Sequence, residues 1–439
     1  MKRKLRFIIP SFIGVFLFIT PIIVDGEMTI PIAILVKLVS EFIRPIVPIL
    51  ALIFVGFSVF GGLFNIDKYL KNSYLKTLLH PSMAWRVVRG MGLVFLIMIV
   101  FKLGGEYFCG TNTGGLILNT LFPVLFAVFL VAGLLLPLLL NFGLLEFTGT
   151  LLTKVMRPLF LLPGRSSINC IASWLGDGTI GILLTNKQYV GGYYTQREAA
   201  VIGTTFSAVS ITFCLVVIET VGLGNMFLPF YLTVSGAGVV AALIMPRIPP
   251  LSRKKDLYYN NTPANVSELI PNGETPFSWG VKLAQERADS NKKISSFFVD
   301  GLKNVLDMWV GVLPVVLAVG TVALMLAEYT PLLQYLGVPF YPMLEFMGVP
   351  EAKAASETMM VGFADMFIPS ILAAGTITSP MTRFIVAALS VTQLIYMAEV
   401  GGLLLGSKIP ISFTNLIAIF IERTIITLPI IVLVAKFLF

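Results

Sequence analysis

Long uncharged apolar runs alternate along this chain with shorter polar segments. Several of these runs reach or exceed the roughly 20 residues that an α-helix needs to cross a bilayer, and the clearest are 45–64, 117–142, 199–218, 226–246 and 308–327. In lipid every backbone polar group must be satisfied within the segment, which favours helices over open strands. The pattern therefore predicts an all-α polytopic membrane protein.

Counting the less regular runs as well predicts about nine transmembrane helices, over 5–24, 45–64, 85–103, 117–142, 199–221, 226–246, 305–327, 384–404 and 410–435. The first run follows Met-Lys-Arg-Lys and resembles a signal peptide. It lacks a small-residue cleavage site, so we interpret it as a retained span. Residues 30–44 are amphipathic and end at Pro45, which fits either an interfacial helix or part of a long broken span.

Two stretches are too interrupted for simple spans. Residues 158–186 contain several prolines and glycines and the charged residue Asp177, and residues 328–382 are similarly rich in proline. Broken backbone at membrane depth is tolerated only where protein or a water-filled cavity covers it. We therefore expect two re-entrant hairpins.

A short pattern occurs twice along the chain. Residues 210–219 and 390–399 both begin S-x-T, continue as an apolar run and end in a glutamate, and an interrupted segment with one aspartate precedes each. Two broken, charge-bearing units indicate the substrate site of a transporter. The count of spans makes the two copies run in opposite directions, which predicts inverted repeats; one miscounted span would make them parallel.

Composition and charge support this interpretation. The chain is 56% hydrophobic and 12% charged, and its mean hydropathy is +0.91. The net charge of +8 does not require a nucleic-acid partner, because basic residues in membrane proteins concentrate in cytoplasmic loops. The basic N-terminus and residues 247–303, with nine Lys or Arg against six Asp or Glu, are therefore expected in the cytoplasm.

Residues that support catalysis or metal binding are scarce. The three cysteines are scattered without a C-x-x-C pair, and the chain has one histidine, so we expect no metal site, disulfide framework or cofactor. No nucleotide-binding P-loop or H-E-x-x-H motif is present, and an enzyme is not expected. An intramembrane aspartyl enzyme using Asp177 and Asp365 remains an alternative.

The candidate binding residues are carboxylates, hydroxyls, amides and one arginine placed in apolar or interrupted segments. An uncompensated carboxylate at the centre of a bilayer costs about 2.5–3.5 kcal/mol on insertion scales, so its presence suggests a function. Helix-end carboxylates at the headgroup level, hydroxyls bonded to their own helix and an arginine counter-ion are the structural alternatives. The candidates are Asp177, Asp365, Glu399, Glu219, Thr179, Asn169, Glu357, Thr358, Ser390, Thr392, Gln393, Ser210, Thr212 and Arg423.

Several of these segments resemble a known family. Trp174-Leu-Gly-Asp177, Gly362–Pro369 and Ser379-Pro-Met-Thr-Arg383 leading to Gln393–Glu399 resemble the Gate, or nucleoside-recognition, domains. The whole architecture resembles the YjiH family of bacterial inner-membrane proteins, most strongly over 143–246 and 328–435. Related Gate modules occur in concentrative nucleoside transporters, ferrous-iron transporters and spore maturation proteins. The resemblance implies a transport-type fold in the bacterial cytoplasmic membrane, without fixing the substrate.

Together these observations divide the chain into N-terminal transmembrane helices (1–142), a first Gate-like repeat (143–246), a cytoplasmic linker (247–303) and a second Gate-like repeat with its preceding helix (304–439). We expect a secondary transporter for a small polar or cationic solute, such as a nucleoside or amino acid, with Na⁺ or H⁺ as the coupling ion and a central site between the repeats. A membrane scaffold or assembly factor and a channel remain alternatives. The expected partners are the solute and membrane lipid, and a homodimer is left open.

Overall fold

The computed structural model describes residues 2–20, 22–24, 27–66, 73–81, 83–175, 178–206, 211–261, 270–271, 273–290 and 294–439. Over these residues the fold is helical, apart from one short antiparallel hairpin. Its strands are β1 (Ile22–Val24) and β2 (Glu27–Thr29), and Ile22 pairs with Thr29. The prediction of an all-α polytopic membrane protein is confirmed.

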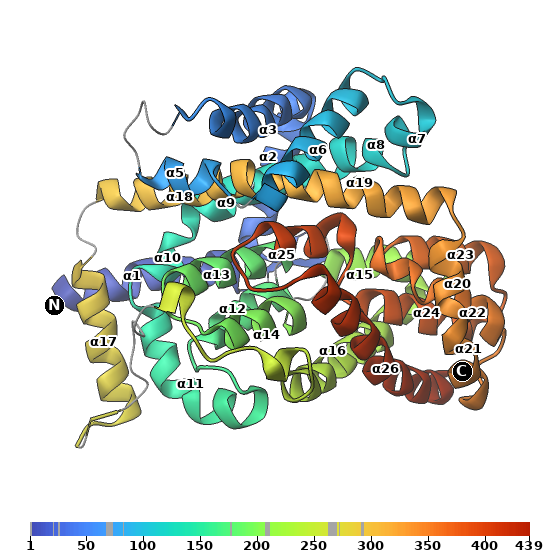
Figure 1. The fold of residues 1–439 in the computed structure, drawn as a ribbon. Coiled ribbons are helices and arrows are strands. Elements are labelled where there is room, and N and C mark those ends of the chain that lie inside the picture. Colours follow the sequence, from blue (N-terminus) through green and yellow to red (C-terminus); the bar gives the residue numbers. More distant parts are fainter. Residues whose placement is uncertain are drawn as a thin grey trace.

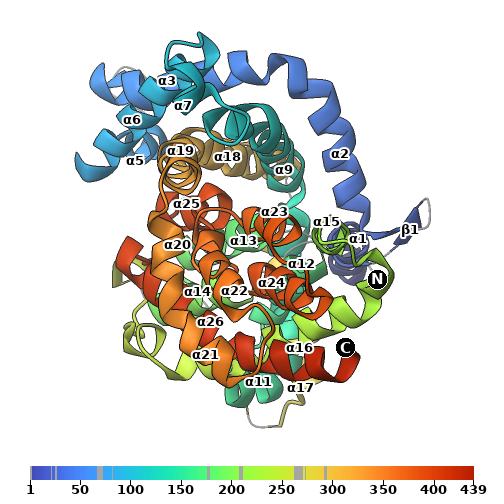
Figure 2. The same ribbon diagram turned by 90° about the vertical axis from the view of Figure 1, so that its right-hand side faces the viewer.

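Helices from the N-terminal part and the middle of the chain form one layer, drawn at the top of Figures 1 and 2, which we call the platform layer. Helices α18 and α19 follow one another along this layer and contact α9 and α6, respectively. The members of the layer are α2 (Pro31–Ile43), α3 (Val47–Leu63), α5 (Ser73–Leu79), α6 (Met83–Val100), α7 (Gly105–Cys109), α8 (Gly114–Leu116), α9 (Phe122–Leu135), α18 (Ile294–Gly311) and α19 (Leu313–Tyr329).

The remaining long helices form a second layer below it, which we call the repeat bundle. Its first half consists of α11 (Leu144–Phe160), α12 (Ser166–Leu175), α13 (Gly178–Val190), α14 (Gln196–Thr205), α15 (Ile211–Thr220) and α16 (Phe227–Ile244). Its second half consists of α20 (Leu332–Gly337), α21 (Tyr341–Phe346), α22 (Ala352–Thr358), α23 (Ile368–Thr376), α24 (Pro380–Thr392), the π-helical turn η9 (Met397–Gly401), α25 (Gly402–Gly406) and α26 (Phe413–Leu438).

Three helices gather at one end of the molecule, at the left of Figure 1. They are α1 (Lys2–Phe18), α10 (Pro137–Leu140) and α17 (Pro276–Ser290). Helix α1 contacts both α10 and α17, and α17 also packs along α11. Helix α17 belongs to the polar segment 247–303, so part of this segment is helical.

Seven helical segments among the described residues are long and apolar enough to cross a membrane, and each matches one of the expected spans. They are Pro31–Leu63, Met83–Val100, Gly105–Leu140, Gly224–Arg253, Ser295–Tyr329, Pro380–Gly406 and Phe413–Leu438. The first of them shows that residues 30–44 continue into 45–64 as one long broken span. The 3₁₀ turn η1 (Arg44–Ile46) joins the two parts at Pro45, where a proline is compatible with the first turn of the next helix.

Two expected spans differ from the structure. Helix α1 has 17 residues and ends at Phe18, before Pro21, because a proline disfavours helical backbone at the residue that precedes it. Its apolar stretch is Leu5–Phe18. The expected span 199–221 is divided into α14, which ends at Thr205, and α15, which begins at Ile211. Phe206 lies outside α14, and residues 207–210 lie outside the described part of the chain.

Large apolar side chains on the outer helices are exposed at the surface of the protein. Phe12 on α1, Ile49 on α3 and Leu228 on α16 each expose more than half of their surface. A surface with many such side chains is unfavourable in water. Lipid chains would cover it without that cost, as expected for outer faces of a membrane protein.

Candidate functional site

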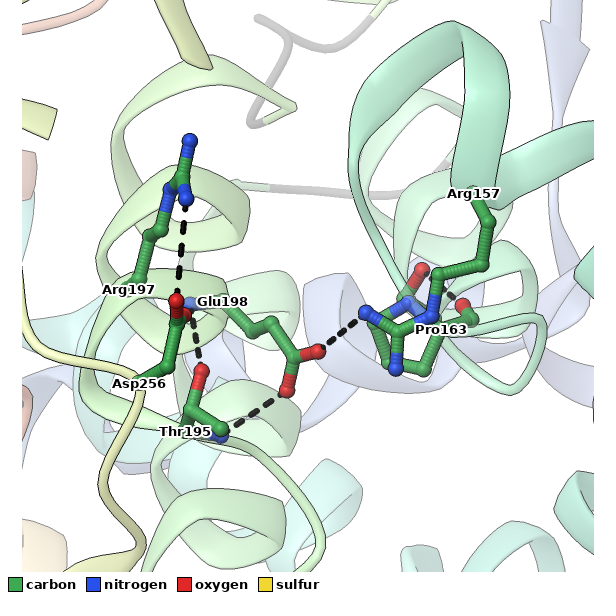
Figure 3. A network of polar contacts seen from close by, with 7 residues as sticks. Arg157, Pro163, Thr195, Arg197, Glu198 and Asp256 are labelled. Carbon is green, nitrogen blue, oxygen red and sulfur yellow. Dashed lines mark hydrogen bonds and ion pairs between the residues drawn. The ribbon is translucent and has the colours of Figure 1, made fainter. Parts of the chain in front are cut away.

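The start of α14 is fixed by a polar network, shown in Figure 3. Thr195 and Glu198 form a capping box: the Glu198 amide donates to the Thr195 hydroxyl at 3.2 Å, and the Thr195 amide donates to Glu198 Oε2 at 2.9 Å. Arg157 of α11 donates to Glu198 Oε1 at 2.6 Å, and Arg197 lies 3.7 Å from Asp256. The capping box satisfies amides that the first helical turn leaves without partners, so α14 has a well-defined origin.

The end of α14 meets the end of α24 at Arg423, on α26. This side chain is 1% exposed. Its Nε and Nη2 donate to the carbonyl oxygen of Thr392, the last residue of α24, at 3.0 and 2.8 Å. Its Nη1 donates to the carbonyls of Thr204 and Thr205, which end α14, at 3.5 and 3.4 Å. The C-terminal ends of helices carry partial negative charge, so one guanidinium caps two of them.

The acceptors around Arg423 bear on whether this side chain is a binding residue or a counter-ion to a carboxylate. Within the described part of the chain, no carboxylate forms an ion pair with it. Its hydrogen-bond partners are backbone carbonyls, and its planar fork suits this divergent set better than an ammonium group would. Arg423 therefore holds the centre of the repeat bundle together.

The second break in the bundle follows Thr392 directly. Helix α24 ends there, Leu394 takes a left-handed φ of 61°, and the π-helical turn begins again at Met397. Gln393 Nε2 donates to the carbonyl of Met359 and to the hydroxyl of Thr424, both at 2.8 Å. Tertiary partners thus replace the helical bonds at this break, and the expected span 384–404 is a discontinuous helix.

The second interrupted stretch contains α20, α21, α22 and α23, and the last two are joined through the 3₁₀ turn η8 (Val361–Phe363). Asp365 lies in the connection, half-buried, and its Oδ1 accepts the amide of Phe367 at 2.8 Å. The amide of Ala398 donates to the carbonyl of Ala364 at 2.9 Å. This bond joins the backbone segments that carry Asp365 and Glu399, so two carboxylates lie on adjacent segments beside the break.

The first interrupted stretch folds as the contacting pair α12 and α13. Asn169 on α12 is fully buried, and its Nδ2 lies 3.5 Å from the hydroxyl of Thr185 on α13. Its Oδ1 has no hydrogen-bond partner in the described chain. Thr179 is buried in the first turn of α13. Asp177 lies between the two helices and outside the described residues.

Each hairpin packs against the discontinuous helix of the other half. Helix α15 contacts α23, with the rings of Phe213 and Phe367 5.7 Å apart. Helix α13 contacts α25, and the amide of Lys408 donates to Asn186 Oδ1 at 2.9 Å. The two halves of the bundle therefore interlock around the breaks.

Other predicted residues take positions that the structural alternatives describe. Glu219 is exposed in the last turn of α15. The hydroxyls of Thr358 and Ser390 donate to carbonyls three residues earlier, at 2.7 and 2.9 Å. Glu357 is half-buried on α22.

The two copies of the S-x-T pattern do not occupy matching places. The second copy, Ser390 to Thr392, ends α24 before its break, whereas the first overlaps the start of α15, after the break. Ser210 and the side chain of Thr212 lie outside the described residues. Thr392 retains a contact across the bundle, since its hydroxyl lies 3.4 Å from that of Thr427 on α26.

Two kinds of group that hold the breaks were not predicted from the sequence. Thr424 and Thr427 of α26 bind Gln393 and Thr392. Thr427 lies four residues after Arg423 and so on the same helix face, a spacing that could have identified it. The carbonyls that Arg423 binds belong to the backbone, so no residue type in the sequence identifies them. Within the described residues, no group of three or more His, Cys, Asp and Glu side chains gathers as a metal site.

Comparison with known proteins adds two findings. The family model for nucleoside recognition, called Gate, matches residues 122–224. This segment runs from α9 through α15, overlaps the predicted first repeat and begins two helices earlier, with α9 and α10. The chain is also similar to a protein of Alkalihalophilus pseudofirmus, named Uncharacterized protein BpOF4_10220, with 49% identity over 441 residues that cover 100% of this chain and 95% of the relative.

A Gate domain within a many-span helical protein fits a membrane transporter. The chain belongs to the same family as the Alkalihalophilus pseudofirmus protein, and its residues 122–224 form a Gate nucleoside-recognition domain.

Proposed function

We propose that the chain is a secondary-type transporter for a small polar or cationic solute, such as a nucleoside or an amino acid, with its site between the two halves of the repeat bundle. The observation that carries the proposal is the pair of discontinuous helices, α14–α15 and α24–η9, whose half-helix ends meet at Arg423. Transporters build midplane sites from such interrupted helices, one in each repeat.

Asp365 and Glu399 would supply the negative charge of the site. They lie on hydrogen-bonded neighbouring segments, where they could hold a cationic group of the solute or the coupling ion, Na⁺ or H⁺. Asn169, with a buried acceptor that has no partner among the described residues, would bind a hydrogen-bond donor of the solute. Asp177 would be the counterpart of Asp365 in the first half.

Movement of one half against the other would expose the site to each side of the membrane in turn. The interlocked packing supports this, because each hairpin contacts the discontinuous helix of the opposite half. A shift of either half would therefore change both sides of the site together.

The finer assignments belong to the same proposal. Residues 304–439 would be a second Gate-like repeat, since a hairpin (α22–α23) is followed there by a discontinuous helix, as in the first half. The repeats would be inverted, and the chain would belong to the YjiH family of the bacterial cytoplasmic membrane. The basic N-terminus and the 247–303 linker would face the cytoplasm.

Uptake into proteoliposomes tests the proposal. Purified protein would be reconstituted and offered labelled nucleosides and amino acids, with and without a Na⁺ or pH gradient. We expect saturable uptake of one class by the wild type and a loss of about tenfold or more in the Asp365→Asn and Asp177→Asn variants, the scale expected when a bond to a charged group is lost. Glu345→Gln is the matched control, because Glu345 is exposed on α21 and bonds only Tyr341 among the described residues.

The other possible results of the uptake assay would each contradict a different part of the proposal. Normal uptake by both aspartate variants would show that these carboxylates are not part of the site. Unsaturable flux would indicate a channel. Absence of flux across the panel, from protein that remains folded, would favour a membrane scaffold.

A further inference from the structure

A pair of adjoining polar cavities lies between the platform layer and the repeat bundle. The first, of about 420 Å³, is lined by residues of α5, α6, α13, α18 and the segment after α25. The second, of about 480 Å³, extends toward the start of α26. Both are lined by Arg89, Gly311, Gly406, Ser407 and Lys408. Cavities of this size accommodate small ligands.

The lining is strongly basic. Its described residues include five cationic side chains, Arg89, Lys187, Lys254, Lys303 and Lys408, and a single carboxylate, Asp307. That carboxylate is already engaged, because it forms an ion pair with Lys187 and accepts the Tyr74 hydroxyl at 2.7 Å.

Lys254 also has partners. Its Nζ donates to the carbonyl of Pro410 and to Asn415 Oδ1, both at 2.6 Å. Over the described residues, Arg89, Lys303 and Lys408 are left without a carboxylate partner. The cavity pair therefore carries uncompensated positive charge.

Arg89 provides an independent observation. It lies on the membrane-spanning helix α6 and is 6% exposed. Its Nη1 donates to the Leu78 carbonyl at 2.9 Å and to the Ser58 hydroxyl at 3.2 Å, but its Nε has no partner among the described residues. A buried guanidinium without a counter-charge is costly, and this one lines both cavities.

Lys408 lies on the opposite wall, in the loop between α25 and α26. Partial burial lowers the pKa of Lys408, the nearby Arg89 guanidinium lowers it further, and Asp307 acts in the opposite direction. Arg89 and Lys408 thus line the same space, one from α6 and the other from the loop after α25, and an anion could fill this space.

We propose that these cavities bind a phosphate group, carried either by a soluble metabolite or by an anionic lipid. Several unpaired cations favour a multiply charged oxyanion over a single carboxylate, and the arginine fork matches phosphate geometry. A bound phosphate would connect α6 of the platform layer to the loop after α25 of the repeat bundle. This site is separate from the solute site proposed between the two halves of the repeat bundle and does not depend on it.

Thermal unfolding in dodecyl maltoside, with inorganic phosphate titrated at constant ionic strength, tests the soluble source. Wild-type protein in nanodiscs of phosphatidylcholine, with or without phosphatidylglycerol, tests the lipid source. The variants are Arg89→Gln and Lys408→Gln. Because Arg89 is buried, its variant could fail to fold, whereas the Lys408 side chain is partly exposed. Lys353→Gln, an exposed lysine on α22, is the matched control.

We expect phosphate, or phosphatidylglycerol if a lipid is the source, to raise the unfolding temperature of the wild type and of Lys353→Gln. Lys408→Gln should need about tenfold more phosphate, or lose most of the lipid effect, as expected when a charge-assisted hydrogen bond is removed. Absence of stabilisation by both probes would overturn the proposal. So would a Lys408→Gln variant that responds like the wild type.

Discussion

The guanidinium of Arg423 makes four hydrogen bonds to carbonyls at the ends of α14 and α24. Lysine keeps the charge but cannot reproduce this fork. We expect Arg423→Lys to lower the free energy of unfolding by about 2 kcal/mol, because buried carbonyls lose their donors. Lys436→Gln, an exposed cation on the same helix, should have little effect. If Arg423→Lys and the wild type unfolded at the same temperature, the hydrogen bonds of Arg423 would not be needed for stability.

Asp365 combines two roles that substitutions can separate. Its Oδ1 accepts the Phe367 amide, and asparagine retains an oxygen in that place. We expect Asp365→Asn to fold with near wild-type stability, and Asp365→Ala to lose about 1 kcal/mol with the hydrogen bond. Thermal unfolding measures the difference in stability between the two variants, and uptake assays measure the effect of removing the charge. An alanine variant as stable as the asparagine variant would contradict the turn-forming role.

At the scale of helices, the close approach of α6 to α19 depends on one glycine. A Cβ at Gly92 would lie 2.2 Å from the carbonyl oxygen of Pro314, whereas a Cβ at Gly90 would meet nothing within 4 Å. We expect Gly92→Ala to destabilise the protein by about 2 kcal/mol through overpacking, and Gly90→Ala to be neutral or slightly stabilising. If the Gly92→Ala and Gly90→Ala variants gave the same unfolding curve, this helix packing would be contradicted.

The long spans could be predicted because their signal is local: an unbroken apolar run is sufficient. The break after Thr392 could not be predicted from the sequence, because the residues around it include neither glycine nor proline. It is held by partners distant in sequence, the Met359 carbonyl, Thr424 and Arg423. Asp365 could be singled out as a candidate site residue because a carboxylate in an apolar segment is conspicuous.

For the whole molecule, the segment Ser295–Tyr329 sets the orientation of both layers. Its 35 residues, at about 1.5 Å each, give about 52 Å, well beyond the roughly 30 Å of the bilayer core. Helix α17 precedes this segment and α21 follows it, at opposite ends of the molecule in Figure 1. The two flanking helices should therefore lie on opposite sides of the membrane.

Cysteine labelling can test this arrangement. In a background with Cys109, Cys170 and Cys214 replaced, the exposed positions of Lys282→Cys and Glu345→Cys would report on α17 and α21. Because basic segments remain in the cytoplasm, we expect an impermeant maleimide to label Lys282→Cys only in inside-out vesicles and Glu345→Cys only in spheroplasts. Labelling of both from one side would mean that Ser295–Tyr329 does not cross the membrane, and the inverted arrangement of the repeats would fail with it.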